Sequence, residues 1–230
     1  MGLRSYLRKI TGTAVDKEEH LNISYSQEGE DLVLGRIFEN QRDGFFVDVG
    51  ALHPTRYSNT YRFYKIGWRG INIDAMPGSM KLFNEVRPND INIERPISDK
   101  AEMLDYYIFN EPALNTLSKS LAEERCLKDK YYIERVVNIA TTTLTEVLDE
   151  NLPKNIEIDF LTIDAEGLDY QVLKSNNWKI YSPKVVLIES EFTIKEMVES
   201  DIDKLLSENN YEIFAKTVKT YFYKVKSFNI

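Results

Sequence analysis

Acidic residues recur where successive predicted strands end. Apolar runs predict strands at residues 45–49, 71–74, 91–99, 158–164 and 185–189. Each run contains or ends on a carboxylate, in order Asp48, Asp74, Asp99, Asp164 and Glu189. The carboxyl ends of parallel strands meet at one edge of an open sheet, where such proteins bind ligands. A carboxylate there is costly to desolvate without a partner, so the pattern predicts a ligand rich in hydroxyl and amino groups.

The run at residues 45–51, Phe-Phe-Val-Asp-Val-Gly-Ala, is the strand around which we expect the sheet to be organised. Gly50 lacks a Cβ atom and allows the backbone to approach a ligand closely. The Gly-x-Gly-x-x-Gly fingerprint of NAD-binding folds is missing, because the chain continues with Ala-Leu-His-Pro. One glycine, with a second acid (Asp74) at the next strand end, favours a nucleoside ligand without pyrophosphate, and S-adenosylmethionine meets that description.

The composition argues against several classes of function. Hydrophobic residues make up 43% and charged residues 29% of the chain, as in ordinary globular proteins. The net charge of −8 argues against a nucleic-acid partner, which requires a basic surface. With His20 and His53 as the only histidines, we assign no metal site; an ion held by Asp164 and Glu166 is the alternative.

No apolar run is long enough for a transmembrane segment, so none is expected. Cys126 is the single cysteine, which excludes an internal disulfide and favours a reducing, cytoplasmic location. The start of the chain is basic and weakly amphipathic, and we expect a solvated or frayed segment over residues 1–24. Contact of this segment with a membrane surface is the alternative.

We expect one α/β domain over residues 25–230, which is a common length for such a domain. The alternation of strands and helices is interrupted after residue 100, where a polar, helical stretch at 115–135 separates two further strands. This predicts an insertion near residues 110–135, either a substrate-facing lid or a surface decoration. A helix is expected at 194–209, and alternating residues at 211–216 and 220–225 predict an antiparallel hairpin.

Ordered blocks of the sequence resemble the FkbM-type S-adenosylmethionine-dependent methyltransferases. They read SQEGED at 26–31, FVDVGA at 46–51, SNT at 58–60, GWRGINID at 67–74 and IDAEG at 163–167. The resemblance implies S-adenosyl-L-methionine as cofactor and the class I methyltransferase fold. That fold is a Rossmann-like three-layer sandwich with a mostly parallel seven-stranded sheet and an antiparallel last strand, which agrees with the predicted terminal hairpin.

The resemblance also implies roles for individual residues. Asp48, Gly50 and Ala51 would face the methionine part of the cofactor, Asp74 the ribose, and Ser98 with Asp99 the adenine edge. Asp164 and its loop would close the site. The other predicted cofactor contacts lie beside these blocks: Gln27, Glu30, Ser58, Asn59 and Ala75. Many members have a small residue or second glycine soon after Gly50, whereas the His-Pro pair here predicts a stiffer loop.

Methyl transfer to a hydroxyl benefits from a general base. His53 is a candidate because imidazole titrates near neutrality, and Asp164 and Glu166 are the other catalytic candidates. A loop cap is the alternative role for His53, and an ion pair is the alternative for Glu166. We expect O-methylation of a sugar or glycan hydroxyl. The alternatives are a methyltransferase for a non-sugar small molecule, a non-catalytic methyltransferase-like binding protein and a nucleotide-sugar oxidoreductase.

Overall fold

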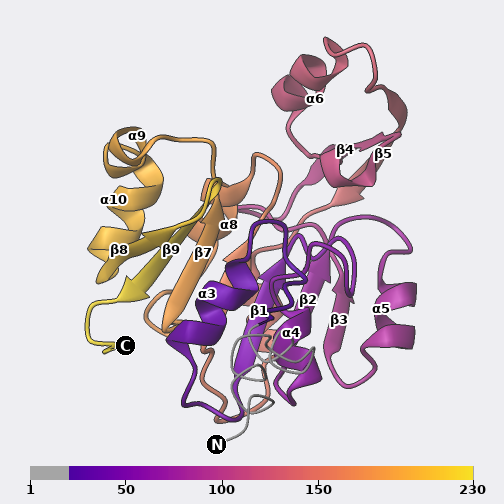
Figure 1. Ribbon diagram of the computed structural model, residues 1–230. Coiled ribbons are helices and arrows are strands. Elements are labelled where there is room, and N and C mark those ends of the chain that lie inside the picture. The colour runs from indigo at the N-terminus through magenta and orange to yellow at the C-terminus, as the bar shows by residue number, and fades with distance from the viewer. Residues whose placement is uncertain (1–20, 230) are drawn as a thin grey trace, which may run out of the picture.

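The computed structural model describes residues 21–229, so the predicted N-terminal segment at 1–24 lies almost entirely outside the described residues. A seven-stranded sheet in the order β3-β2-β1-β6-β7-β9-β8 forms the centre of the molecule (Figure 1). Its strands are β1 Phe45–Val49, β2 Arg69–Asp74, β3 Ile91–Glu94, β6 Phe160–Ile163, β7 Val185–Glu189, β8 Tyr211–Lys216 and β9 Thr220–Val225.

Strand β1 lies at the point where the strand order reverses. It pairs in parallel with β2 on one side and with β6 on the other. Further pairs are parallel out to β3 and β7, whereas β9 is antiparallel to both of its neighbours, β7 and β8. The predicted mostly parallel sheet with an antiparallel terminal hairpin is therefore confirmed. Such a reversal opens a crevice at the carboxyl ends of the strands.

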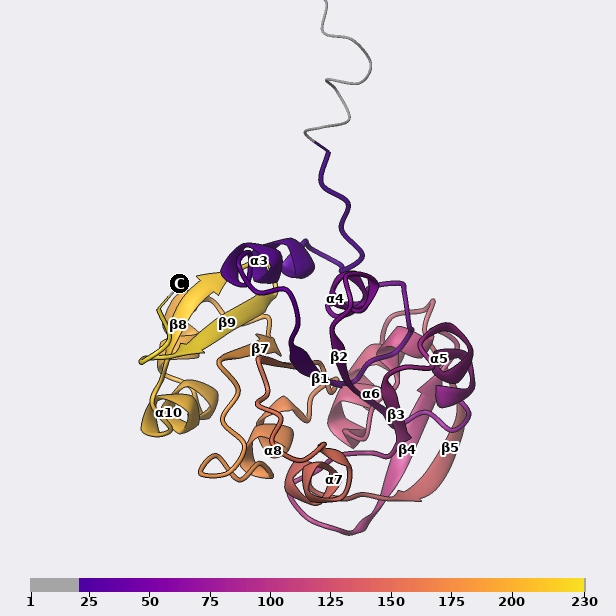
Figure 2. The ribbon, with the colours of Figure 1, turned by 90° about the horizontal axis from the view of Figure 1, so that it is seen from below.

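Helices cover both faces of this sheet (Figure 2). On one side lie α3 Glu30–Ile37 and α4 Tyr61–Lys65, and on the other lie α7 Leu144–Asn151, α8 Asp169–Lys174 and α10 Asp201–Glu208. Helix α5, Met80–Val86, packs beside β3 at the sheet edge. The three-layer arrangement that the family resemblance implied is thus observed.

Side chains of β1 alternate between the two hydrophobic layers. Phe46 packs with Leu34 of α3 and Phe63 of α4, while Val47 and Val49 belong to the cluster on the opposite face. Successive residues of a strand point to opposite faces. Asp48 therefore shares the face of Phe46 and α4, and this decides which residues surround its carboxylate.

The single helix expected at 194–209 was wrong. The chain forms α9 Ile194–Val198 and then α10, because the Ser200 hydroxyl accepts a hydrogen bond from the Asp203 amide at 3.1 Å and starts a new helix. Serine at the N-cap satisfies an amide that the first turn leaves without a partner.

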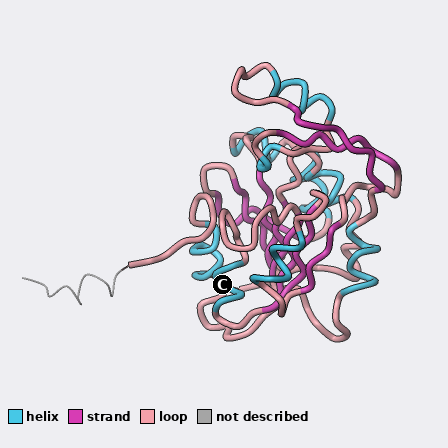
Figure 3. Tube along the Cα trace, turned by 90° about the vertical axis from the view of Figure 1, so that its right-hand side faces the viewer, coloured by secondary structure: helices cyan, strands magenta, loops and turns pink. Residues whose placement is uncertain are grey.

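A separate two-stranded sheet, β4 Met103–Phe109 with β5 Ile133–Ala140, projects beyond the main sheet (Figures 1 and 3). Between its strands lie the 3₁₀ turn η1 Pro112–Leu114 and helix α6 Lys119–Cys126. The helix predicted over 115–135 is therefore much shorter than expected. Thr116 pairs with Tyr107 of β4, and the Ser118 hydroxyl caps the start of α6.

None of the helices within residues 21–229 has the length and apolar character that crossing a bilayer requires.

Gly50, directly after β1, lies close to Asp164, directly after β6. Its φ is +84°, and a Cβ atom there would lie 1.7 Å from the carbonyl oxygen of Asp164. The Asp164 amide also donates a hydrogen bond to the Val49 carbonyl at 2.9 Å. The sequence predicts that the backbone at Gly50 approaches a ligand closely. The structure shows that the same glycine also lets the backbone approach the carbonyl of Asp164, directly after β6.

Replacing Gly50 with alanine is expected to lower the free energy of unfolding by about 3 kcal/mol or more, because a left-handed backbone and a steric clash add together. Gly78 is the matched control: its φ is +90°, but a Cβ atom added there would have no atom within 4 Å. Gly78→Ala should cost only about 1 kcal/mol. Urea unfolding of both variants measures the difference, and equal losses would contradict the clash.

Candidate functional site

A polar pocket opens at the carboxyl edge of the sheet, near the ends of β6 and β7 and the start of β9. Four predicted site residues line it: Gln27, Glu30, Asn59 and Asp164. The other lining residues are Glu28, Tyr57, Thr162, Ile163, Glu189, Lys219 and Thr220. The structure therefore brings together segments that are up to about 190 residues apart in the sequence, because all of them end or turn at this edge.

The segment before α3 is fixed to the turn between β8 and β9. The buried Glu30 carboxylate accepts a hydrogen bond from the Thr220 hydroxyl at 3.0 Å. Glu28 accepts from the Lys219 amide at 2.8 Å. Gly29, with φ +87°, allows the chain to turn between these two acids. These contacts form the wall of the pocket beside β9.

Asp164 and Glu189 lie at the ends of neighbouring strands, directly after the register pair Ile163 and Ile188. Burial and the nearby Glu189 raise the pKa of Asp164 well above its ordinary range. Burial disfavours the charged form of the carboxyl group, and Glu189 disfavours a second negative charge beside its own. Among the described residues that line the pocket, Lys219 is the one basic residue, and its Nζ atom lies 3.8 Å from Glu189 Oε1. The pocket is therefore predominantly acidic.

The loop after β6 is held in an uncommon conformation. Glu166 has φ +46°, which is unusual for a residue with a side chain. The Asp169 carboxylate accepts hydrogen bonds from the amides of Ala165 at 3.0 Å and Gly167 at 3.3 Å. The Thr116 hydroxyl donates to the Glu166 carbonyl at 2.7 Å. Several contacts thus fix this loop at the site.

The Glu166 side chain is directed to the β4–β5 hairpin and does not line the pocket. It forms an ion pair with Arg125 of α6. Burial raises the pKa of Glu166, while Arg125 acts in the opposite direction. The ion pair that the sequence offered as the alternative role for Glu166 is the contact observed.

Asp48 and Ser58 lie just behind the pocket. Asp48 accepts a hydrogen bond from the Thr60 hydroxyl at 2.9 Å, and burial raises the pKa of Asp48 to about 6. The Ser58 hydroxyl accepts from the Tyr61 amide at 3.1 Å at the start of α4. Asn59, the residue after Ser58, donates a hydrogen bond to the Thr162 hydroxyl at 3.0 Å and does line the pocket.

A second group of predicted residues surrounds the ends of β1 and β2. The buried Asp74 carboxylate accepts hydrogen bonds from the amides of Leu52 at 2.9 Å and Met76 at 2.8 Å. Both Gly50 and Ala51 donate their amides to the Ile73 carbonyl. Asp74 thereby joins the turn after β1 to the turn after β2, and the half-buried Ala75 lies in the chain between Asp74 and Met76.

Ser98 and Asp99 are farther along the same edge. The Ser98 amide donates to the Thr142 carbonyl at 2.9 Å. Asp99 pairs with Lys174 of α8 at 3.0 Å, and this hydrogen bond lowers the pKa of Asp99. These two residues do not line the pocket that contains Asp164.

His53 has the geometry of a loop cap. Its Nδ1 atom accepts hydrogen bonds from the amides of Thr55 and Arg56, both at 3.1 Å. An Nδ1 that accepts from two amides carries no proton, so the neutral ring holds its proton on Nε2. Neither nitrogen of this tautomer is free to accept a proton from a substrate while the cap is intact.

Lys219 and Thr220 are site residues that sequence reasoning missed. They reach the carboxyl edge because β9 runs antiparallel to β7, which places the start of β9 beside the end of β7. The predicted hairpin alone could not place Lys219 and Thr220 at the site, because their position also depends on the pairing of β9 with β7. Glu189 was recognised as a strand-end acid, but its proximity to Asp164 follows from the strand order.

No group of three or more His, Cys, Asp or Glu side chains suited to a metal ion occurs in the described part of the chain.

The family model of the methyltransferase FkbM domain matches residues 48–213, which is more than half of the chain. No curated protein matches the sequence significantly. Similar solved structures include a precorrin-6y C5,15-methyltransferase from Geobacter metallireducens, with 12% identity, a TM-score of 0.43 and coverage of 84% of each chain.

Another is the fibrillarin of Aeropyrum pernix with natively bound S-adenosyl-L-methionine, with 12% identity, a TM-score of 0.45 and coverage of 85% of this chain and 73% of that one. A third is a TehB-like SAM-dependent methyltransferase from Corynebacterium glutamicum, with 10% identity, a TM-score of 0.40 and coverage of 97% of both chains. The family assignment rests on the sequence match, because these structural scores are low.

The cap formed by His53 predicts a pH-dependent contribution to stability. Burial and Arg56 lower the pKa of His53 below its ordinary value of 6.5, so the folded state binds this proton more weakly than the unfolded state. The stabilisation is complete above that ordinary value and is lost as the pH falls through it toward the lowered pKa.

His53→Asn retains an acceptor for the two amides but does not titrate. The wild-type protein should therefore lose stability relative to His53→Asn when the pH is lowered from about 7.5 to about 5.5. Urea unfolding of both proteins across this range measures the difference. A constant difference would show that the ring does not cap the loop in its neutral form.

Proposed function

Because the chain belongs to the FkbM methyltransferase family and uses S-adenosyl-L-methionine as its methyl donor, we propose that its acceptor is a hydroxyl group of a sugar or glycan. The observation that carries this proposal is the pocket beside the switch point between β1 and β6. Most of its lining residues are polar, and four of the five charged ones are acidic, with Asp164 among them. The methionine part of the cofactor would occupy the inner part of this pocket, and a neutral, hydroxyl-rich acceptor at its mouth would supply hydrogen-bond donors to the oxygen atoms that the cofactor leaves free.

The residues at the carboxyl edge fit the cofactor. S-adenosyl-L-methionine carries a sulfonium and an ammonium group. The described lining of the pocket contains four carboxylates and one basic residue, Lys219, and this excess of acidic groups suits these positive charges. We assign Asp48, Gly50 and Ala51 to its methionine part, together with the residues Gln27, Glu30, Ser58, Asn59 and Asp164. We assign Asp74 and Ala75 to the ribose, and Ser98 and Asp99 to the adenine. When bound, the cofactor supplies a methyl group that its positive sulfur makes electrophilic.

Asp164 is the general base that the contacts favour. Its raised pKa makes the Asp164 carboxylate a stronger base toward the proton of a hydroxyl. Glu166 is engaged by Arg125, and Nδ1 of His53 is engaged by two backbone amides. We therefore place Asp164 first and keep Glu166 and His53 as secondary candidates.

The surroundings of Asp164 favour a sugar over other acceptors. Tyr57 lines the pocket with 54% of its surface exposed and offers an aromatic face to a sugar ring. The net charge of −8 and the acidic lining disfavour polyanions such as nucleic acids. The single cysteine is consistent with a cytoplasmic location. A non-sugar small molecule is the second candidate acceptor.

Two measurements test this function. Isothermal titration with S-adenosylhomocysteine should give a Kd below about 1 mM, and no binding at about that concentration would favour a non-catalytic binding protein. Incubation with labelled S-adenosyl-L-methionine and a panel of monosaccharides, nucleotide sugars and oligosaccharides, followed by mass spectrometry, should show transfer to a hydroxyl. Transfer only to amines or to non-sugar hydroxyls would contradict the proposed acceptor.

Asp164→Asn is expected to lower kcat by about 100-fold or more, because the amide cannot accept the hydroxyl proton. His53→Asn and Glu166→Gln should have smaller effects. The exposed Glu157 provides a control, and Glu157→Gln should behave as the wild type. Initial rates with the best acceptor of the panel measure kcat and KM. A nearly unchanged kcat in Asp164→Asn would remove Asp164 as the base.

A further inference from the structure

Arg87 is a fully buried cation beside the loop between β1 and α4. It follows α5, and its guanidinium lies over the rings of Phe46, Tyr64 and Phe83, at 5.3, 5.2 and 5.8 Å from the ring centroids. A buried charge is costly unless it is paired and hydrogen bonded. The contacts of this guanidinium therefore show which parts of the fold depend on it.

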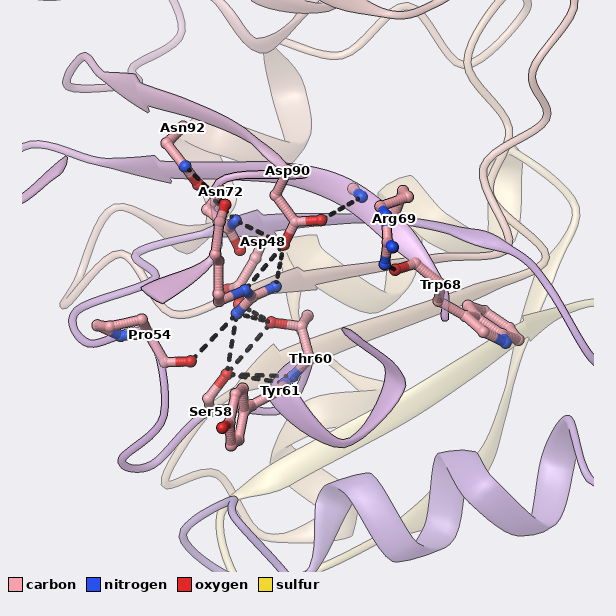
Figure 4. A network of polar contacts seen from close by, with 12 residues as sticks. Asp48, Pro54, Ser58, Thr60, Tyr61, Trp68, Arg69, Asn72, Asp90 and Asn92 are labelled. Atoms are coloured by element: carbon pink, nitrogen blue, oxygen red, sulfur yellow. Dashed lines mark hydrogen bonds and ion pairs between the residues drawn. The ribbon is translucent and has the colours of Figure 1, made fainter. Parts of the chain in front are cut away.

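One side of the guanidinium is paired with Asp90. The Nη2 atom of Arg87 lies 2.7 Å from Asp90 Oδ2, and Nε donates to the same oxygen at 2.8 Å. Asp90 also accepts hydrogen bonds from the Gly70 amide and the Asn72 side chain, both at 3.2 Å. Asp90 thus anchors Arg87 to strand β2 (Figure 4).

The other side of the guanidinium reaches the loop between β1 and α4. The Nη1 atom donates to the Thr60 hydroxyl at 2.9 Å and lies 3.5 Å from the Pro54 carbonyl and the Ser58 hydroxyl. These three oxygen atoms lie on one side of the guanidinium, opposite Asp90, in the close view of the network (Figure 4). The cation therefore holds the middle and the end of this loop, and the hydrogen bond to Thr60 is the shortest of its contacts there.

Thr60 passes this contact on to β1. Arginine is only a donor, so the Thr60 hydroxyl accepts from Arg87 and directs its own hydrogen to Asp48, at 2.9 Å. Valine has almost the same shape as threonine but can make neither contact. The direction of both hydrogen bonds is fixed by chemistry, which makes Thr60 a relay between a buried cation and a buried carboxylate.

The same loop carries two residues in an unfavourable backbone conformation. Leu52 has φ +51° and Tyr57 has φ +56°. Such conformations persist where the surrounding structure over-determines them, and they concentrate at functional sites. Tyr57 and Asn59 of this loop line the pocket. The loop therefore needs an anchor, and the guanidinium with its hydroxyl relay supplies one.

We propose that Arg87 and Thr60 are positioning residues for the cofactor, which hold the loop between β1 and α4 in the conformation that places Tyr57 and Asn59 in the pocket. Neither residue lines the pocket itself. The proposal rests on the function given above, since it assumes that this pocket receives the methionine part of S-adenosyl-L-methionine.

Thr60→Val tests the relay and leaves the pair of Arg87 and Asp90 intact. Isothermal titration with S-adenosylhomocysteine should show an affinity about tenfold lower than in the wild type, whereas Thr60→Ser should stay within about threefold. The control is Thr145→Val on α7, which removes a hydroxyl that donates to the Ser175 carbonyl at 2.7 Å, away from the loop. Its affinity should stay within about twofold, even if its Tm falls as in Thr60→Val.

A pH profile of the affinity separates positioning from a loss of stability. Asp48 faces Arg87, Asp74 and Asp90, and the Thr60 hydrogen bond is one of the contacts that lower its pKa from a still higher value. In Thr60→Val, the pH below which the affinity falls should therefore be higher than in the wild type. Thr145→Val should leave this pH unchanged.

The proposal is overturned if Thr60→Val binds within about twofold of the wild type, if Thr60→Ser is as weak as Thr60→Val, or if the pH profile does not move. Failure of the wild-type protein to bind S-adenosylhomocysteine is a different outcome. It would overturn the proposed function, and the positioning role with it.

Discussion

The contact between Gly50 and the carbonyl of Asp164 is the constraint on which the site depends. It fixes the ends of β1 and β6 against each other at the point where the strand order reverses. Glycine permits this close approach, and the hydrogen bond from the Asp164 amide to the Val49 carbonyl holds Asp164 beside the turn that leads from β1 to α4. The pocket, the acid that we place as the base and the cofactor edge all follow from this contact.

Burial and like charge then determine the electrostatics of the edge. Asp48, Asp74 and Asp164 all have pKa values raised by burial, and each has a different partner. Asp48 has the hydroxyl relay to Arg87, Asp74 has backbone amides, and Asp164 has a second carboxylate. Asp164 is therefore the acid that would gain most from a positively charged ligand. This difference among similar strand-end acids is the reason that we propose Asp164, and neither Asp48 nor Asp74, as the general base.

The β4–β5 hairpin connects to the same site from outside the main sheet. Its α6 residue Arg125 and its Thr116 both contact Glu166, and Asn115 donates to Met76 Sδ in the turn after β2 at 3.6 Å. The hairpin thus contacts the turns that follow two separate strands of the main sheet. Its position over these turns supports the interpretation as a substrate-facing element more than that of a surface decoration.

The sequence by itself determined the sheet, the ligand edge and the family, because apolar periodicity, strand-end acids and the ordered motif blocks are all local signals. The missing glycine fingerprint also made a pyrophosphate ligand an unfavourable prediction. Helix boundaries were less predictable, as in 194–209, because the hydroxyl of Ser200 ends one helix and begins another. The residue at which a helix ends depends on which local hydrogen bonds the packing of the folded chain permits.

Only the tertiary structure decided which motif residues face the pocket and which support it. Asn59 lines the pocket while its neighbour Thr60 turns toward Asp48, and Glu166 turns toward Arg125 of the hairpin. Lys219 joins the site from the far end of the chain because β9 is antiparallel. Sequence spacing records which residues are present, but the direction of each side chain depends on partners distant in the sequence, and these meet only in the folded protein.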